Sequence, residues 1–190
     1  MREILSMIIV LSAICTASGL SLAYLKEVTA PIIEAQVLTN VQGPAIERVY
    51  PAADNKPIEE RKSFELDGRK IMVFPYRQGG KLQGVALESH GGGYGGDIGV
   101  MVGFNMGNDS LLGISVTLMK ETPGLGSKIA EPKLSGQFRG APLAVELKSK
   151  GGNIDAISGA TISSTGAVTA VQAAAKDFQA LKPQIQQVWQ

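Results

Sequence analysis

Apolar and polar positions divide the chain into three parts: an uncharged N-terminal run, a central region of short segments and a C-terminal segment with helical spacing. Residues 4–25 carry no charge and are mostly apolar. At about 1.5 Å per residue they would form a helix of roughly 33 Å, long enough to cross the hydrocarbon core of a bilayer. We therefore predict a transmembrane anchor over residues 1–25. A cleaved signal peptide is the alternative, although Arg2 stands beside Glu3 and no clear small-x-small cleavage site precedes Lys26.

Residues 26–63 are predicted to be a helical and loop connection. Ala30-Pro31 can open a helix, because proline is tolerated in the first helical turn. Gly43-Pro44 should kink or divide that helix, and Tyr50-Pro51 should end it. Residues 52–63 are polar and charged, which predicts a loop.

In the third predicted part, residues 64–190, the apolar spacing first shortens to that of strands. Two turn signals, Gln78-Gly79-Gly80 and Gly107-Asn108-Asp109, join predicted strands in pairs. Because such connections are short, the sheet should be mainly antiparallel. The predicted fold class is therefore α+β: one N-terminal transmembrane helix, then a mainly antiparallel sheet flanked by helices. The predicted strands cover residues 70–76, 82–88, 98–105, 111–119 and 143–147.

The C-terminal segment is predicted to be a short strand, residues 154–157, followed by a long helix. The chain breaks at the small residues 158–160, and from Ile162 to Leu181 the apolar residues keep one face of a 3.6-residue period. Lys182-Pro183 should end this helix, because proline disfavours helical angles in the residue before it.

Thr161 falls where this helix begins. Backbone N–H groups at a helix start lack internal partners, and the helix dipole favours negative charge there, so a phosphate would be stabilised. The alternative is that Ser158 or Thr161 serves only as the N-cap of the helix, a common role for serine and threonine.

Composition excludes several classes of protein. The net charge is +1, from 18 basic and 17 acidic residues, which gives little support to nucleic-acid binding. Cys15 is the one cysteine and His90 the one histidine, so neither a disulfide nor a thiolate or histidine metal centre is expected. Gly91-x-Gly93-x-x-Gly96 matches a dinucleotide fingerprint by letter, but residues 98–104 after it are strand-like, whereas that fingerprint opens a helix.

Asp155-x-x-Ser158-Gly159-Ala160-Thr161 resembles the flavinylation motif of the FMN-binding domain family. In that family the closing threonine carries FMN through a phosphoester bond made by a dedicated flavin transferase. The resemblance implies that FMN is the cofactor and that Thr161 is its covalent attachment point. Attachment through the phosphate would leave the flavin ring chemically free, with its potential set by surrounding hydrogen bonds and burial.

Two further blocks resemble segments of the same family. Residues 121–128, Glu-Thr-Pro-Gly-Leu-Gly-Ser-Lys, resemble its ETPGLG segment, and residues 93–96, Gly-Tyr-Gly-Gly, resemble its glycine-aromatic-glycine turn. Both can also be plain turns. Beside a flavin, Thr122 would bond a ring heteroatom, Leu125 would cover a ring face and Lys128 would offset phosphate charge.

No catalytic and no metal-ligating residue is predicted, and all predicted site residues are cofactor-binding. The predicted set consists of Thr161 as the attachment point with Ser158, Gly159, Ala160, Ser163, Ser164, Asp155, Glu121, Thr122, Gly124, Leu125, Gly126, Lys128, Tyr94 and Gly95.

With its anchor and length, the chain resembles the family of G subunits of Rnf electron transport complexes. This resemblance implies a flavoprotein component of an ion-translocating ferredoxin:NAD oxidoreductase in the bacterial inner membrane, with its flavin domain outside the cytoplasm. The implied partners are the other membrane, iron–sulfur and flavin subunits of the Rnf complex, and the flavin transferase. Three alternatives stay open: the related C subunit of the sodium-translocating NADH:quinone reductase, a membrane-tethered flavin sensor, and a structural domain with an unmodified Thr161.

Overall fold

A computed structural model describes residues 2–189 of the chain. The chain divides into two compact units, Met1–Asn40 and Val41–Gln190. The first unit is almost entirely one helix, α1 (Arg2–Val37), none of whose residues is buried. By length and composition α1 is suited to cross a membrane. The predicted boundary between anchor and connection at residue 25 stays a prediction.

The helix expected to open at Ala30-Pro31 is not a separate element, because Pro31 lies inside α1. A proline within a helix removes one backbone hydrogen bond. The helix nevertheless continues, since the turns on both sides keep their own bonds. A short π-helical segment, Leu38–Gln42, follows α1, and a separate helix, α2 (Gly43–Val49), begins after it. The helix is therefore divided at Gly43-Pro44, as predicted.

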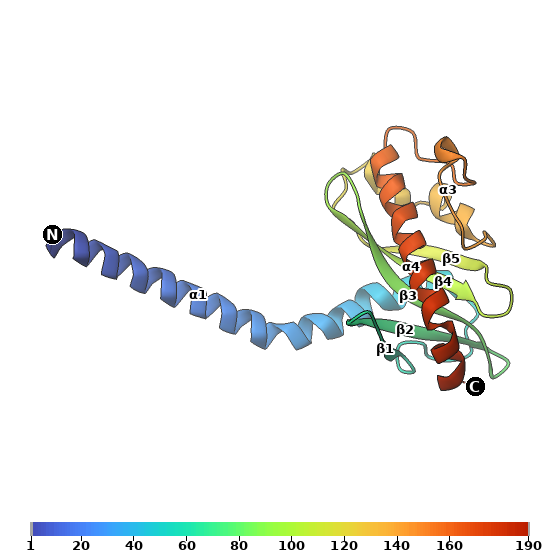
Figure 1. Cartoon of the computed structure of the whole chain (residues 1–190), viewed down its shortest axis with the longest axis horizontal. Coiled ribbons are helices and arrows are strands. Elements are labelled where there is room, and N and C mark those ends of the chain that lie inside the picture. Colours follow the sequence, from blue (N-terminus) through green and yellow to red (C-terminus); the bar gives the residue numbers. More distant parts are fainter. Residues whose placement is uncertain (1, 190) are drawn as a thin grey trace. The chain divides into compact units, whose positions relative to one another are not determined.

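The second unit is built on a five-stranded sheet in the order β1-β2-β3-β4-β5, and every neighbouring pair is antiparallel (Figure 1). The predicted α+β class is confirmed. The strands are β1 (Lys62–Leu66), β2 (Arg69–Gln78), β3 (Lys81–Gly92), β4 (Asp97–Asn105) and β5 (Leu111–Leu118).

Two of the hairpins have two-residue turns, Asp67-Gly68 and Gly79-Gly80. All four residues have positive φ, between 51° and 75°. Such turns match the right-handed twist of the strands that they join. The predicted hairpin at Gly79-Gly80 is therefore confirmed, whereas the one at Asp67-Gly68 was not anticipated.

The strand predictions need three corrections. The loop predicted to extend to residue 63 gives way to β1 at Lys62, and Phe64 of β1 is buried. Residues 143–147 and 154–157 are not strands, because only a single parallel bridge, between Leu147 and Ile154, joins them. Both of these residues are buried, so their apolar character serves the core without a strand ladder.

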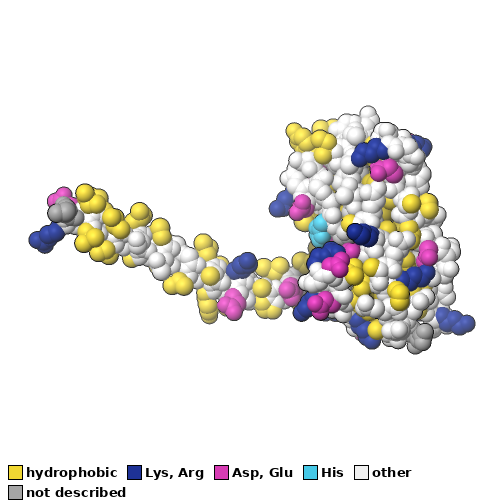
Figure 2. Space-filling view, in the orientation of Figure 1, with side chains coloured by type: hydrophobic (Ala, Val, Ile, Leu, Met, Phe, Trp, Pro, Cys, Tyr) yellow, Lys and Arg dark blue, Asp and Glu magenta, His cyan; other side chains and the backbone are white. Residues whose placement is uncertain are grey.

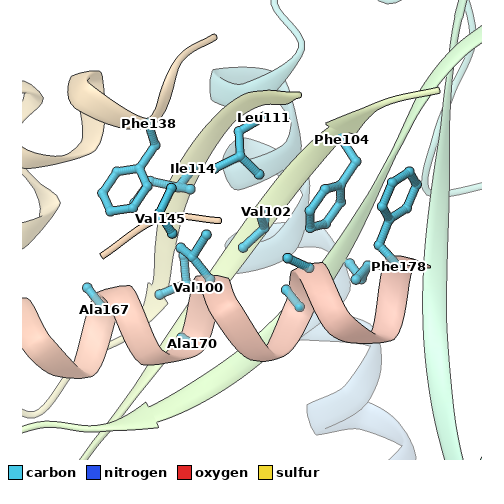
Figure 3. Close-up of a cluster of buried hydrophobic side chains, with 14 of the residues drawn as sticks. Val100, Val102, Phe104, Leu111, Ile114, Phe138, Val145, Ala167, Ala170 and Phe178 are labelled. Atoms are coloured by element: carbon cyan, nitrogen blue, oxygen red, sulfur yellow. The ribbon is translucent and has the colours of Figure 1, made fainter. Parts of the chain in front are cut away.

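Helices cover both faces of the sheet. On one face α4 (Thr161–Val188) packs against β3 and β4, and Val100, Val102 and Phe104 of β4 point toward it (Figure 3). On the other face α2 packs against β4 and β5, and Gly103 lies against Val49. The alternation of strand side chains thus divides β4 between the two helices.

Helix α4 runs past the predicted stop at Lys182-Pro183 and ends at Val188. Ile185 and Trp189 beyond the proline are buried in the core. Their burial outweighs the local preference of proline, since tertiary packing supplies most helical stability in proteins. Short helices fill the connection between β5 and α4: η2 (Gly126–Ala130), α3 (Pro132–Ser135), η3 (Gly136–Phe138) and η4 (Lys148–Lys150).

Candidate functional site

Glycines bring the first part of α4 into close contact with the end of β3. A Cβ atom added at Gly91 would overlap the carbonyl oxygen of Gly166, and one added at Gly166 would lie 2.5 Å from the carbonyl oxygen of Gly92. Without side chains at these positions, the backbones of helix and strand can approach directly. The start of α4 therefore lies beside the turn that follows β3.

That turn is the Gly93-Tyr94-Gly95-Gly96 segment. The N–H of Gly93 donates to the carbonyl oxygen of Gly96 at 2.8 Å, and Gly96 has a φ of 148°. Tyr94 at the tip is 74% exposed, which is unusual for a large aromatic side chain. The turn thus holds an aromatic ring out from the protein surface.

The segment after β5 supplies a second tight turn. The N–H groups of Leu125 and Ser127 donate to the carbonyl oxygen of Thr122, at 3.2 and 3.3 Å. Gly124, whose φ is 77°, donates its N–H to the hydroxyl of Ser127 at 2.9 Å. These bonds leave Leu125 half exposed, at 50%.

Glu121 connects both turns to α4. One carboxylate oxygen accepts a hydrogen bond from the N–H of Gly95 at 3.0 Å. The other accepts a hydrogen bond from the hydroxyl of Ser163, in the first turn of α4, at 2.5 Å. Three segments that lie far apart in the sequence therefore meet at one side chain.

Thr161 is the first residue of α4 and does not cap it. Ala160 occupies the N-cap position and makes no side-chain capping bond. The hydroxyl that supports this turn belongs to Ser164, which is fully buried, accepts the N–H of Ile157 at 3.0 Å and donates to the carbonyl of Ala160 at 2.9 Å. The capping role considered for Ser158 or Thr161 is therefore wrong, and the Thr161 side chain is left exposed.

These segments enclose a cleft of about 440 Å³. Three large apolar side chains that line it are well exposed: Tyr94 at 74%, Leu125 at 50% and Ile162 at 54%. Hydrophobic side chains gather at the end of the domain where α4 begins (Figure 2). The cleft is lined by Tyr94, Glu121, Thr122, Leu125, Gly126, Gly159, Ala160, Thr161, Ile162 and Ser163.

Most of the predicted site residues come together in this cleft, but six do not line it. Asp155 forms an ion pair with Lys148 at 2.6 Å, and its backbone N–H donates to Gln137 at 2.7 Å. Ser164 is buried beneath the helix start. Gly95 contributes its N–H to Glu121 and does not line the cleft. Ser158 and Gly124 are exposed and adjoin lining residues in the sequence, and Lys128 is exposed two residues after Gly126.

Ile162 lines the cleft although the sequence pattern counted it with the buried face of α4. Its position beside Thr161 was the available signal, since a residue in the first turn can lie beyond the edge of the sheet.

A larger cavity of about 660 Å³ lies between α2 and residues 51–59, and no predicted site residue lines it. Within residues 2–189, no group of three or more His, Cys, Asp or Glu side chains is arranged to hold a metal ion.

Comparison with known proteins points to the same region as a binding site. Residues 93–176, which include all three segments, match the family model described as FMN-binding domain. The G subunit of the ion-translocating oxidoreductase complex of Methanosarcina acetivorans is 35% identical over 138 residues, covering 70% of this chain and 72% of that protein. The G subunit of the proton-translocating ferredoxin:NAD(+) oxidoreductase complex of Clostridium ljungdahlii is 28% identical over 168 residues, covering 86% and 85%.

A solved structure shares the fold. It is the crystal structure of the C subunit of the Na(+)-translocating NADH-quinone reductase from Parabacteroides distasonis, with a TM-score of 0.52 and 25% sequence identity. The match covers 60% of this chain and 63% of that chain.

The second unit of the chain therefore contains an FMN-binding domain, whose matched residues surround the cleft at the start of α4. The chain as a whole belongs to the family of G subunits of ion-translocating oxidoreductase complexes. The predicted resemblance to the G subunits of Rnf complexes is confirmed.

The residues of the cleft fit a flavin. Its volume lies in the range of about 300–1,000 Å³ that is usual for small-molecule sites. Its exposed apolar side chains suit a flat aromatic ring, and the hydroxyl of Thr122 is a polar partner for a ring edge or a sugar hydroxyl. The start of α4 suits a phosphate.

Proposed function

We propose that this protein is the flavoprotein component of a membrane-bound, ion-translocating redox complex of the Rnf type, with FMN esterified through its phosphate to Thr161. The observation that carries the proposal is the state of Thr161. It is exposed at the helix start, makes no cap, and lines a cleft whose walls are exposed apolar side chains. A threonine that only stabilised the helix start would not need to lie in a cleft lined by exposed apolar side chains.

In this proposal the first backbone N–H groups of α4 stabilise the phosphate, since they precede the first intrahelical bond, from Ser164 to Ala160. Tyr94, Leu125 and Ile162 cover the ring faces. Attachment forms a bond between the Thr161 oxygen and phosphorus, displaces the leaving group of an activated FMN donor used by the flavin transferase, and releases the hydroxyl proton. The bound cofactor supplies a ring that accepts and donates electrons.

Helix α1 and the relatives support a membrane setting. We propose that α1 is an uncleaved single anchor in the cytoplasmic membrane and packs among other membrane subunits of the complex. Ala13, Ala17, Ser18, Gly19 and Ser21 would permit close helix approach there. The flavin domain would lie outside the cytoplasm and exchange electrons with iron–sulfur and flavin subunits. The name of the Clostridium ljungdahlii relative favours a complex that works between ferredoxin and NAD.

The attachment site is tested by intact mass and by in-gel flavin fluorescence of the denatured full chain, co-expressed with a flavin transferase. Wild type should show the mass of one esterified FMN and a fluorescent band, and Thr161→Ala should show neither. Thr169→Ala is the matched control, because Thr169 is exposed on the same helix two turns further on. Thr161→Ser should keep part of the modification, since it keeps the hydroxyl. Flavin on the Thr161→Ala chain would refute this site.

The side of the membrane is tested by cysteine labelling in intact cells. In a Cys15→Ser background, Gln179→Cys places one thiol on an exposed position of α4. A membrane-impermeant maleimide should label it without lysis if the domain is extracytoplasmic. The Cys15→Ser chain alone is the control and should stay unlabelled. Labelling that requires lysis would place the domain in the cytoplasm.

A second candidate is the role of the C subunit in a sodium-translocating NADH:quinone reductase, favoured by the fold shared with the Parabacteroides protein. A third is a membrane-tethered flavin sensor outside any pump. Co-purification separates the three. Rnf-type iron–sulfur subunits support the first proposal, quinone reductase subunits support the second, and a flavinylated chain without redox partners supports the third.

A further inference from the structure

Glu121 has an unusual position for a carboxylate. It is 9% exposed, and the other buried polar side chains that the structure describes are all serines, Ser115, Ser163 and Ser164. None of the ion pairs among residues 2–189 involves Glu121. A buried carboxylate is costly unless hydrogen bonds satisfy it. Two of its acceptor positions are used by Gly95 and Ser163, so these two bonds keep it in place.

Glycines make room for this carboxylate on two sides. A Cβ atom at Gly93 would overlap one carboxylate oxygen, and a Cβ atom at Gly126 would overlap the other and lie 2.8 Å from the Ser163 hydroxyl. A side chain at either position would displace Glu121 or break its bonds. The glycines of the two turns therefore admit the carboxylate as well as shaping the turns.

Among residues 2–189, these two are the hydrogen bonds that link Glu121 to the glycine turn on one side and to the first turn of α4 on the other. The glycine turn carries an exposed tyrosine, Tyr94, at its tip, and residues 122–125 are all exposed. Neither segment has an apolar side chain in the core that would fix its position. Backbone contacts bring the segments together at Gly91, Gly95 and Gly166, and the side chain of Glu121 adds the hydrogen bonds that fix them to one another.

We infer that Glu121 is a positioning residue, which assembles the cleft in the unmodified chain by fixing both turns to the first turn of α4. Through Ser163 it also fixes the helix start that carries Thr161. The geometry of its hydrogen bonds, and not its charge, performs this role. Only the consequence for flavin attachment rests on the function proposed above.

Glutamine at position 121 separates geometry from charge. Its carbonyl oxygen can accept the N–H of Gly95, and its NH₂ can donate to the hydroxyl of Ser163, which is able to act as acceptor. Both contacts survive with one reversed in direction. Alanine removes both, and Ser163→Ala removes one without changing charge.

The experiment is hydrogen exchange of the full chain in detergent, expressed without flavin transferase so that Thr161 is unmodified. Glu121→Ala should speed exchange of the amides in residues 93–96 and 122–127 by about tenfold or more, since a lost buried hydrogen-bond partner changes local opening by that order. Residues 168–185 of α4 should exchange as in wild type. Glu121→Gln should stay within about twofold of wild type, and Ser163→Ala should fall between the two.

Glu65→Ala and Glu65→Gln are the controls, because Glu65 is exposed on β1. Unchanged exchange in Glu121→Ala would overturn the inference, as would Glu121→Gln behaving like Glu121→Ala. If Glu121→Ala loosens the whole domain, thermal unfolding will show it, and Ser163→Ala then decides: local loosening supports the inference, and wild-type exchange overturns it.

Flavin attachment is measured separately by intact mass, as a time course with the transferase. Glu121→Ala should be modified several-fold more slowly than wild type. Glu121→Gln should be modified at about the wild-type rate. If wild type itself stays unmodified, the proposed function fails while the exchange result still stands. If wild type and Glu121→Ala are modified equally fast, the positioning of Thr161 by Glu121 is refuted and the attachment site is not.

Discussion

In α4, the first turn and the rest of the helix differ in what surrounds their side chains. Between Ala167 and Ile185 most apolar side chains are buried, α4 packs against β3 and β4, and Phe178 stacks on Phe104 with ring centroids 4.5 Å apart. In the first turn Thr161 is exposed, Ile162 is 54% exposed and Ser163 bonds Glu121. One continuous helix therefore has a part that holds the fold and a part that faces the cleft.

The difference shows how the fold and the proposed function are kept separate. The core part stabilises the fold by burying apolar area, and this contribution does not depend on what the cleft binds. The first turn contributes little buried apolar area, so its exposed residues, Thr161 and Ile162, are free to serve a ligand. Substitutions in the two parts should therefore affect different measurements.

The largest effect is expected in the core part. Phe178→Ala leaves a cavity beneath β4 and should lower the free energy of unfolding by about 3–5 kcal/mol. Urea unfolding of the full chain in detergent, followed by circular dichroism, measures this. Flavin attachment to the folded fraction should be unchanged, because the first turn of α4 is untouched. A loss below about 1 kcal/mol would mean that α4 is not packed as described.

At the border between the two parts, Gly166→Ala should destabilise by about 1–3 kcal/mol, since its Cβ would lie too close to the carbonyl of Gly92. In an ordinary helix interior the same change stabilises by roughly 0.5–1 kcal/mol, so the sign is the test. Gly136→Ala is the matched control, because open space surrounds Gly136. If both variants were stabilised, the close approach of helix and strand would be refuted.

The sequence predicted the sheet well because its turn signals are local. Two glycines at 79 and 80 need positive φ, and the strands on either side follow from them. Asp67-Gly68 carries an equally strong signal, yet β1 was missed because only Phe64 and Leu66 in it are large and apolar. An edge strand needs few apolar residues, so its pattern is weak.

Features that depend on contacts between residues far apart in the chain could not be predicted from the sequence. Pro183 reads as a helix stop, and only the burial of Ile185 and Trp189 shows why the helix continues. Residues 143–147 are apolar in a strand-like pattern, but no neighbouring strand accepts them.

For the candidate site, resemblance identified three segments, and their meeting at Glu121 required the structure. Asp155, which the motif places in the site, forms an ion pair with Lys148 and does not line the cleft, so its part in cofactor binding stays a prediction.

The comparison is sharpened by Ile162→Ser, a change within the first turn. Ile162 is half exposed, so the free energy of unfolding should change by no more than about 0.5 kcal/mol. The proposed flavin should then become more accessible, and iodide should quench its fluorescence more strongly than in wild type. Val188→Ser is the control, because Val188 is also exposed but lies at the other end of α4. Equal quenching in Ile162→Ser and wild type would separate Ile162 from the flavin.

The smallest effect is expected where Gln172, in the middle of α4, contacts Glu146 in the segment before Asp155. The backbone N–H of Leu147 donates to the carboxylate of Glu146 at 2.8 Å, and Gln172 of α4 donates to it at 3.1 Å. These bonds, the first being the stronger cause, lower the pKa of Glu146 from the ordinary value of 4.5. A lowered pKa in the folded state gives stability that is present above the unfolded value and is lost as the pH falls through the folded one.

Stability should therefore decline below pH 4.5 in part through Glu146, which is exposed enough to keep the effect small. Glu146→Gln removes this titration and should flatten the decline, with little change at pH 7 because an amide oxygen can still accept the N–H of Leu147. Thermal unfolding between pH 3 and pH 7, compared with wild type, measures the difference. Parallel profiles would show that the contact between this turn and α4 does not depend on the charge of Glu146, because the hydrogen bond from Gln172 to the carbonyl oxygen of Val145 holds it without that charge.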